Sequence, residues 1–328
     1  MSQLTADLLL LLVTLVWGTT FVIVKQAISA MGPLTFVAVR FFIAGAILIA
    51  WHVFRAGRPP VAVRRGAGPA SGSGLQAREV CADRLPGTTE PVPPAKTLNA
   101  WYNASREFYA GAVLTGLALF FAYATQTLGL VTVASGKAAF ITGLYVVMVP
   151  IASRAILRAA PDRNSVIGVI LATSGLGLMS LKLPLQVAAG DFLVFLCAIG
   201  FAAHILLVSR YSEHGDPVLF AGAQLLVVSA GSFICAIIFE RPLLVPPGAW
   251  GPVLFTALAA TSFAFLTQSA VQRYTSATHT ALIFSAEPVF GALFAWLMTG
   301  EILVAREIAG AVFILTGMLV SESGLFRT

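Results

Sequence analysis

Charged residues are scarce in this 328-residue chain, and the scarcity restricts its class. Only 10% of the residues are charged, whereas ordinary soluble domains carry about 25%. Hydrophobic residues make up 58% of the chain, and the mean hydropathy is +0.89. A soluble protein cannot bury this much apolar surface, so we expect an all-α membrane protein with lipid as its solvent.

Cysteines and enzyme motifs are also few or missing. The three cysteines have no spacing typical of a disulfide framework or a zinc site. The chain has no phosphate-binding P-loop, no HExxH and no GxSxG, so the sequence predicts no enzyme, no cofactor and no metal. The net charge of +6 does not indicate nucleic acid as a partner, because the basic residues are scattered between apolar runs.

Ten apolar segments are each long enough to cross a bilayer, at roughly 18–24 residues. The first has no basic n-region and no clear cleavage site before it, so it reads as a membrane helix rather than a signal peptide. The predicted segments are Leu8–Ile28, Pro33–Phe54, Phe108–Gly129, Ala134–Leu157, Ser165–Leu181, Asp191–Ser209, Pro217–Phe239, Trp250–Val271, Ser276–Met298 and Val304–Ser321.

One connection, Arg55–Glu107, is long, polar and rich in Pro, Gly, Ser and Arg. Such a composition cannot bury a core, so we predict a disordered insert. Placing the N-terminus inside leaves most basic residues of the connections in the inner loops, largely because of this insert. We therefore expect both termini in the cytoplasm and a multi-pass location in the cell (inner or plasma) membrane.

The chain contains an internal repeat. At an offset of 142 residues, Phe121–Ser180 aligns without a gap with Phe263–Glu322, and at an offset of 184 the stretch at Pro33 resembles the stretch at Pro217. The larger offset fits an insert in the first half only. Each half has five helices, an odd number, so the second copy enters the membrane from the opposite face and the repeats are inverted. Secondary transporters commonly bind substrate between such inverted repeats. The two predicted repeats cover residues 8–181 and 191–322.

Several stretches resemble the EamA family of the drug/metabolite transporter superfamily. They are LVWGTTFVIVKQAI with PLTFVAVRFFIAGAILI, then QTLGLVTVASGKAAFITGLYVVMVP, and QRYTSATHTALIFSAEPVFGALFAWLMTGEILVAREIAGAVFILTGMLV. The resemblance covers nearly all the chain outside Arg55–Glu107, where the family has a much shorter loop. It implies ten helices in two EamA repeats, cytoplasmic termini and transport of small organic metabolites.

Glu287 and Pro288 lie together near the middle of the ninth segment. An ionisable residue there costs about 2.5–3.5 kcal/mol on insertion scales. Two interpretations stay open, a structural or gating role beside a proline kink and a proton-coupling or substrate contact. Arg40, in the second segment, keeps its charge and needs a carboxylate, helix carbonyls or water around it. These three residues are our coupling or gating candidates.

Polar and aromatic residues of several segments are candidates for lining a substrate cavity. Gln126 and its repeat mate Gln268 suit hydrogen bonding between helices. Lys137 attracts an anionic group or snorkels to the outer surface, and its mate His279 is a satisfied polar residue or a group that changes charge near neutral pH. The full set is Trp17, Thr20, Tyr123, Gln126, Lys137, Tyr145, His204, Gln268 and His279.

Together these features predict a secondary transporter that exports small organic metabolites, such as amino acids or amines, by alternating access. The expected partners are a small-molecule solute and the lipid bilayer, with protons as a candidate coupling ion. The alternative is a membrane binding or scaffold protein that acts through the 55–107 loop. Substrate, direction, coupling ion and oligomeric state stay open from the sequence.

Overall fold

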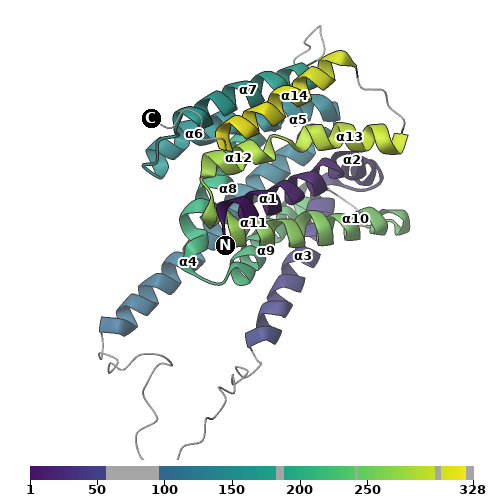
Figure 1. The fold of residues 1–328 in the computed structure, drawn as a ribbon. Helices are drawn as coiled ribbons and strands as arrows, with labels where there is room; N and C mark the ends of the chain where they lie inside the picture. Colours follow the sequence, from purple (N-terminus) through teal and green to yellow (C-terminus); the bar gives the residue numbers. More distant parts are fainter. Residues whose placement is uncertain (57–95, 182–187, 241–242, 300–303, 323–328) are drawn as a thin grey trace, which may run out of the picture.

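The computed structural model describes residues 1–56, 96–181, 188–240, 243–299 and 304–322, and within these every regular element is a helix (Figure 1). The short 3-10 helices are η1 (Ser212–His214), η2 (Pro247–Ala249) and η4 (Gln272–Tyr274), and η3 (Leu258–Phe263) is a π-helix. The α-helices are α1 (Gln3–Gly18), α2 (Thr20–Ala30), α3 (Pro33–Ala56), α4 (Lys96–Leu130), α5 (Ser135–Gly143), α6 (Tyr145–Ile156), α7 (Arg163–Ser180), α8 (Ala189–Tyr211), α9 (Pro217–Phe239), α10 (Trp250–Ala257), α11 (Ala264–Val271), α12 (Ala277–Phe284), α13 (Glu287–Thr299) and α14 (Ala305–Glu322).

The helices follow the predicted apolar segments, although four segments are made of two or more pieces. These are α1 with α2, α5 with α6, α10 with η3 and α11, and α12 with α13. Among the described residues, six spans are long and apolar enough to cross a membrane, or seven if α1 and α2 count as one span bent by 43°. A total of ten crossings therefore stays a prediction.

The insert is shorter than the sequence analysis predicts. Helix α3 continues to Ala56 and α4 begins at Lys96, so helix extends into both ends of the stretch predicted as disordered. The physical reason at the second end is composition, because residues 96–107 contain no Pro or Gly and lead directly into an apolar helix. Residues 57–95, on which the scaffold alternative rests, lie outside the described residues.

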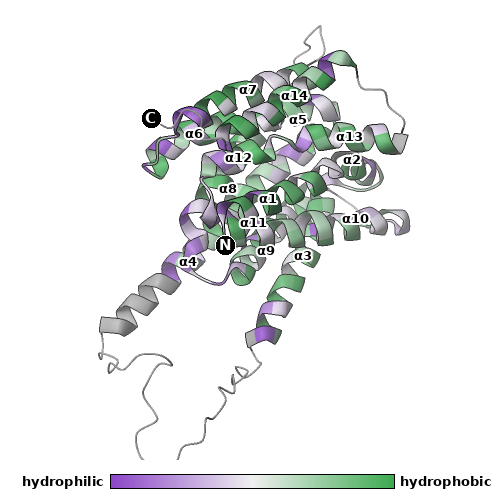
Figure 2. Cartoon of the chain, in the orientation of Figure 1, coloured by the Kyte–Doolittle hydropathy of each residue, from purple (hydrophilic) through white to green (hydrophobic). Residues whose placement is uncertain are grey.

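Hydrophobic residues predominate along the helices of the bundle (Figure 2). Phe42, Ile170, Phe239 and Leu319 are large hydrophobic residues that stay exposed. Helices that are apolar all round are typical of membrane spans, because lipid rather than water surrounds them. The structure is therefore that of a multi-pass membrane protein.

Helices α3 and α9 run side by side and carboxylates hold both ends of the pair. At one end, Glu240 accepts hydrogen bonds from the N–H groups of Leu34 and Thr35, at 2.7 and 2.8 Å, and from the Thr35 hydroxyl at 2.8 Å. At the other end, Asp216 caps α9 and accepts from Arg55 at 2.9 Å. These bonds satisfy backbone donors that the first turn of a helix leaves free.

Helices α7 and α14 also run side by side, and glycines allow their backbones to touch. A Cβ added at Gly168 would lie 2.6 Å from the Gly317 carbonyl oxygen, and one added at Gly317 would lie 2.6 Å from the Gly168 carbonyl oxygen. Gly175 and Gly310 face each other in the same reciprocal way, at 2.5 and 2.6 Å. Small residues at such crossings are typical of membrane helices that pack closely.

Candidate functional site

Four helical segments are interrupted in the middle of the bundle. The α1–α2 segment bends at Thr19, and α5 is followed by α6 after a break at Leu144. Helix α12 ends at Phe284, and a short turn separates it from α13, which begins at Glu287. Between α10 and α11, the π-helix η3 replaces regular α-helix. Each interruption frees backbone groups from the helical ladder, and in a membrane this is tolerated where other protein groups or a cavity satisfy them.

A cavity lies where these interruptions meet. Its water-accessible volume is about 50 Å³, so in this conformation the cavity is smaller than the roughly 300–1,000 Å³ of typical small-molecule sites. The lining is mainly aromatic and polar, and Arg40 and Glu287 are its only Lys, Arg, Asp or Glu side chains among the described residues. The lining residues are Trp17, Thr20, Val24, Arg40, Tyr123, Gln126, Thr127, Leu130, Thr142, Tyr145, Phe201, His204, Ile205, Phe265, Gln268, Phe284 and Glu287.

The π-helix anchors the cationic side of the cavity. Its wider turn leaves the Ala260 carbonyl available, and this oxygen accepts hydrogen bonds from Trp17 Nε1 at 2.8 Å and from Arg40 Nη2 at 3.4 Å. Arg40 Nε also donates to Thr261 Oγ1 at 2.6 Å, and the guanidinium lies 5.4 Å from the Tyr123 ring centroid. One helix carbonyl, one hydroxyl and aromatic faces thus solvate a charge that is only 3% exposed.

A chain of uncharged polar groups occupies the neighbouring wall. His204 Nε2 is 2.9 Å from Gln224 Oε1, and Gln224 Nε2 donates to Ser269 Oγ at 3.1 Å. Because the Gln224 amide donates to Ser269, its oxygen accepts from His204, which places the imidazole proton on Nε2. This arrangement fixes the orientation of the buried His204 ring beside the cavity, with a hydrogen on Nε2.

Gln268 has a hydrogen-bond acceptor to spare. Its Nε2 donates to Gln272 Oε1 at 2.8 Å, while Gln272 itself donates to the Ile205 carbonyl and to Ser209 Oγ, each at 2.7 Å. Gln268 Oε1 has no hydrogen-bond partner among the described residues. A buried acceptor without a partner is costly, so this oxygen is suited to a donor group of a ligand.

Glu287 lies at the first position of α13, and Pro288 follows it in the first turn. Proline is well tolerated there, because the first turn has no carbonyl partner for its missing N–H. Glu287 is partly buried and interacts favourably with the positive charge of Arg40. Its repeat mate Tyr145 also begins a half-helix, α6, so the break exists in both halves and does not require proline.

The profile of the EamA-like transporter family matches residues 4–69 and 188–322. The chain belongs to the EamA-like transporter family. An "uncharacterized transporter" of Archaeoglobus fulgidus is 31% identical over 319 residues, which cover 97% of this chain and 86% of that protein. A protein of known crystal structure has the same fold, with a TM-score of 0.71 at 16% identity over 99% of both chains.

The cavity of this EamA-like transporter contains most of the candidates from the sequence. Trp17, Thr20, Tyr123, Gln126 and Tyr145 line it, and so do His204, Gln268, Arg40 and Glu287. Pro288 is next to the lining without being part of it. Lys137 and His279 are not among the lining residues, and they lie at two ends of the bundle, where they contact Asp191 and Asp7.

Sequence reasoning missed the apolar lining. Phe201, Phe265 and Phe284 are phenylalanines in apolar runs, so hydropathy does not distinguish them from packing residues. The internal repeat does carry a signal. At the two offsets, these three residues are the mates of Trp17, Tyr123 and Thr142, all of which line the cavity.

Proposed function

We propose that this EamA-like protein is a secondary transporter that moves a small organic solute by alternating access across ten membrane-spanning segments. The observation that carries the proposal is the cavity at the meeting point of broken half-helices. Discontinuous helices around a central site are a recurrent feature of secondary transporters, because the freed backbone groups and helix ends bind the solute. The family and the named relative support a transporter rather than an enzyme.

Matched residues of the two halves line the cavity, which supports two inverted five-helix repeats over 8–181 and 191–322. Each pair is related by the offset of 184 before the insert or of 142 after it. The matched lining pairs are Trp17/Phe201, Thr20/His204, Tyr123/Phe265, Gln126/Gln268, Thr142/Phe284 and Tyr145/Glu287.

The glycine contacts between α7 and α14 support the same symmetry. Gly168 and Gly310 are repeat mates, and so are Gly175 and Gly317. An exchange of the two halves therefore turns the Gly168–Gly317 contact into the Gly310–Gly175 contact, and both contacts are present. Two adjacent helices that exchange in this way imply a two-fold axis between them, as inverted repeats require.

Two charged contacts at opposite ends of the bundle fit alternating access. Lys137 Nζ lies 2.5 Å from Asp191 Oδ2, where α5 and α8 begin. Asp7 and His279 are their repeat mates, and they meet near the starts of α1 and α12 with 3.7 Å between Oδ2 and Nε2. In a ten-span topology α5 and α8 begin on one side of the membrane and α1 and α12 on the other, so one contact can open while the other holds.

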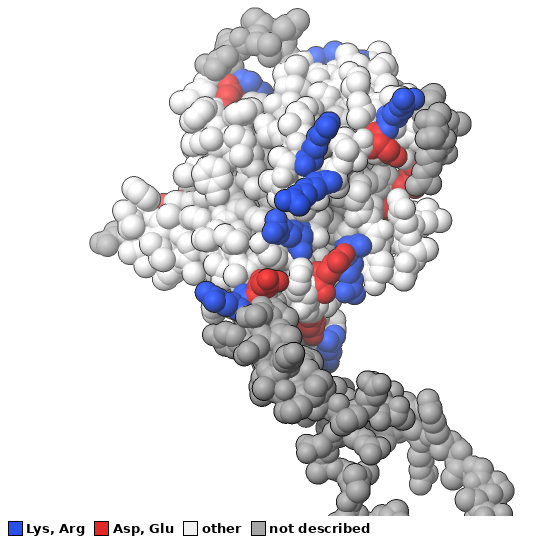
Figure 3. All heavy atoms as spheres, turned by 90° about the vertical axis from the view of Figure 1, so that its left-hand side faces the viewer, with Lys and Arg blue, Asp and Glu red and all other residues white. Residues whose placement is uncertain are grey.

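Arginines support a cytoplasmic position for the end that carries both termini. Figure 3 shows Lys and Arg on the side that Figure 1 shows at the left, where α1 begins and α14 ends. Basic residues in loops favour the cytoplasmic side of a membrane. Exposed arginines in connections or at helix ends are Arg154, Arg158, Arg163, Arg210 and Arg273.

The cavity suits a small zwitterion such as an amino acid, or an organic amine. Arg40 attracts a carboxylate, while Glu287 and the free Gln268 oxygen accept hydrogen bonds from an ammonium group. Trp17 and Phe265 pack on each other with 5.6 Å between their ring centroids, and together they offer an aromatic wall to the apolar part of the solute. We propose export as the direction, and protons as the coupling ion.

Reconstituted liposomes test this proposal. Purified protein should exchange a labelled amino acid or amine from a broad panel, and an imposed proton gradient should drive its accumulation. Glu287→Gln removes the charge at nearly constant volume and should abolish transport or its pH dependence, whereas Tyr145→Phe at the mate position should keep both. Inside-out vesicles measure the direction. Transport of no panel member under gradients of either sign would refute the function, and unchanged transport by Glu287→Gln at every pH would remove Glu287 from it.

A further inference from the structure

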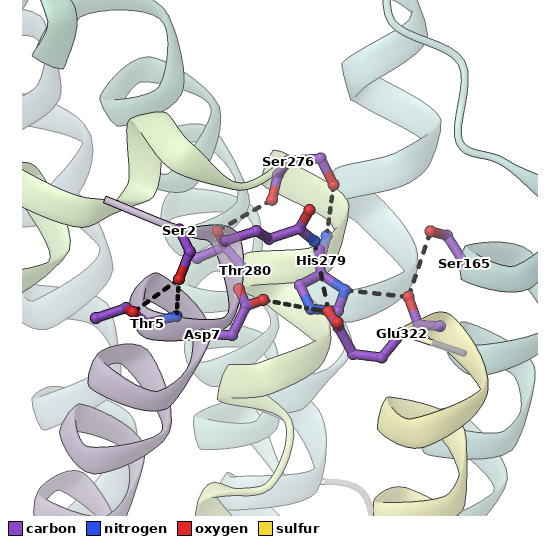
Figure 4. Close-up of polar contacts among 10 residues, drawn as sticks. Ser2, Thr5, Asp7, Ser165, Ser276, His279, Thr280 and Glu322 are labelled. Atoms are coloured by element: carbon purple, nitrogen blue, oxygen red, sulfur yellow. Dashed lines mark hydrogen bonds and ion pairs between the residues drawn. The ribbon is translucent and has the colours of Figure 1, made fainter. Parts of the chain in front are cut away.

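Asp7, His279 and Glu322 bring three metal-ligand groups together at the end of the bundle that carries the termini. They come from α1, α12 and α14, and Figure 4 shows their side chains pointing toward one another. One atom of each lies within 4.8 Å of the other two. Asp7 and His279 are more than nine-tenths buried, at 8% and 5% exposure, while the Glu322 side chain is 39% exposed.

The polar atoms that face the centre of this cluster lack hydrogen bonds. Both Asp7 carboxylate oxygens and His279 Nε2 have no hydrogen-bond partner among the described residues, although Nε2 is in ion-pair contact with Glu322 Oε1. His279 Nδ1 is 3.1 Å from Ser321 Oγ, so an Nδ1–H donated to that hydroxyl leaves the Nε2 lone pair facing two carboxylates. Three electron-pair donors converge here, and two of them are buried, so a positive charge between them, as a proton or a metal ion, is required.

At the opposite end of the molecule, the carboxylate equivalent to Asp7 is neutralised by a cationic side chain. There Lys137, the mate of His279, supplies an ammonium 2.5 Å from Asp191, the mate of Asp7. At the Asp7 end the ammonium is replaced by an imidazole, and Glu322 adds a second carboxylate where its mate in the first half is Ser180. The Asp191 end thus contains a cationic side chain, whereas the Asp7 end contains groups that can bind a cation.

Nearby groups increase the negative potential at the cluster. Asp162 caps α7 by accepting from the Ser165 N–H at 2.8 Å, and its charge also acts on His279. Gln3 Nε2 lies 3.5 Å from Glu322 Oε1 and so makes only a weak bond to the cluster.

We propose that Asp7, His279 and Glu322 bind a divalent transition-metal ion of the zinc class, which ties α1, α12 and α14 together. Zinc binds imidazole nitrogen and carboxylate oxygen at about 2.0–2.2 Å, so two of its ligand atoms lie about 3.2–3.6 Å apart. Asp7 Oδ2 and His279 Nε2 are 3.7 Å apart, close to this spacing. Glu322 contacts His279 more closely and must move outward, which its place in the last turn of α14 permits.

The second shell fits the same role. Ser321 Oγ holds His279 Nδ1 and is itself 3.4 Å from Ser165 Oγ, so the ring orientation is fixed from two helices. Ligating imidazoles commonly bond through their other nitrogen, which sets the tautomer. One imidazole among the ligands favours zinc-class ions over magnesium and calcium, which prefer oxygen alone.

Titration of chelator-treated, full-length protein in detergent with Zn²⁺ tests the site, and it does not depend on any transport activity. We expect saturable binding of one Zn²⁺ per chain, with no comparable binding of Mg²⁺ or Ca²⁺. Asp7→Asn and His279→Gln should lose this binding, Ser321→Ala should weaken it about tenfold, and His214→Gln should leave it unchanged. His214 is the matched control because it is an exposed histidine outside the cluster.

Two further measurements keep the result decisive. Glu322→Gln changes a partly exposed residue at a helix end, so it should keep the fold, as judged by elution volume, and still lower the affinity. X-ray absorption of the zinc-loaded protein should show nitrogen and oxygen ligands with one imidazole. A sulfur ligand, equal binding by all variants, or no saturable binding would overturn the proposal, the last result leaving a proton as the shared cation.

Discussion

The glycine contacts between α7 and α14 allow a quantitative test of the repeat symmetry. In Gly175→Ala the new Cβ would lie 2.5 Å from the Gly310 carbonyl oxygen, and in Gly310→Ala it would lie 2.6 Å from the Gly175 oxygen. Carbon and carbonyl oxygen rarely approach below about 3.3 Å, even in favourable contacts. Either substitution must therefore push the two helices apart by about 0.7 Å.

The expected cost follows from two opposing terms. Overpacking a tight contact lowers the free energy of unfolding by about 1–3 kcal/mol, whereas replacing a helical glycine with alanine raises it by about 0.5–1 kcal/mol. We expect a net loss of about 1–2 kcal/mol for each of the four glycines in the two contacts. Repeat mates should lose similar amounts, because their surroundings are exchanged by the two-fold axis.

Gly177 provides the matched control on the same helix. A Cβ added there would meet its nearest atoms at 3.8 Å, an ordinary van der Waals distance. Gly177→Ala should therefore keep or raise the stability through helix propensity alone. Titration of the detergent-solubilised protein with SDS measures the free energy of unfolding of all variants under one condition.

Combining substitutions sharpens the test. Gly175→Ala with Gly310→Ala should cost less than the sum, because the first substitution already separates the helices at that contact. Gly175→Ala and Gly168→Ala affect two different contacts, so the stability losses in that double variant should be closer to additive. If the four contact glycines behaved like Gly177, the close approach of α7 and α14 would be refuted, and with it this support for inverted repeats.

Other substitutions test the remaining contacts. Arg40→Lys should reduce transport in liposomes at least about tenfold, because an ammonium cannot bond Thr261 and stack on an aromatic ring as the planar guanidinium does; an unchanged rate would contradict the role of this network. Glu240→Gln should lower the free energy of unfolding by about 1.5–3 kcal/mol, since it weakens the charged hydrogen bonds at the start of α3. Thermal unfolding in detergent measures this loss, and an unchanged unfolding temperature would show that these bonds do not stabilise the protein. Lys137→Asp and Asp191→Lys should each slow transport and together restore it, because the double variant rebuilds the ion pair in reverse. Failure of the double variant to recover would argue against a closing contact.

The fold could be predicted from sequence as far as apolar length determines it. The predicted segments coincide with helices because each apolar run must satisfy its own backbone in lipid. The breaks at Thr19 and Leu144 could not be predicted in this way, because neither position has a proline. They depend on packing around the cavity, which the hydropathy of one segment does not report.

The site was predictable where a polar residue interrupts an apolar run. Arg40, Gln268 and Glu287 stand out for that reason, and all three line the cavity. The cluster of Asp7, His279 and Glu322 could not be recognised by ligand spacing, because its members lie near opposite ends of the sequence. Only the folded arrangement of α1, α12 and α14 brings them together.

The lining residues of the cavity occupy matched positions in the two halves but differ in charge, and this has an energetic consequence. The mate of Arg40 is the neutral Gln224, and the mate of Glu287 is the neutral Tyr145. If the two halves exchange conformations during a transport cycle, the charge pair Arg40 and Glu287 is not replaced by an equivalent charge pair of the other half. The two end states then differ in energy even without solute, so the empty protein rests with one side preferred. The ion or solute that compensates this charge pair sets the cost of returning to the other side.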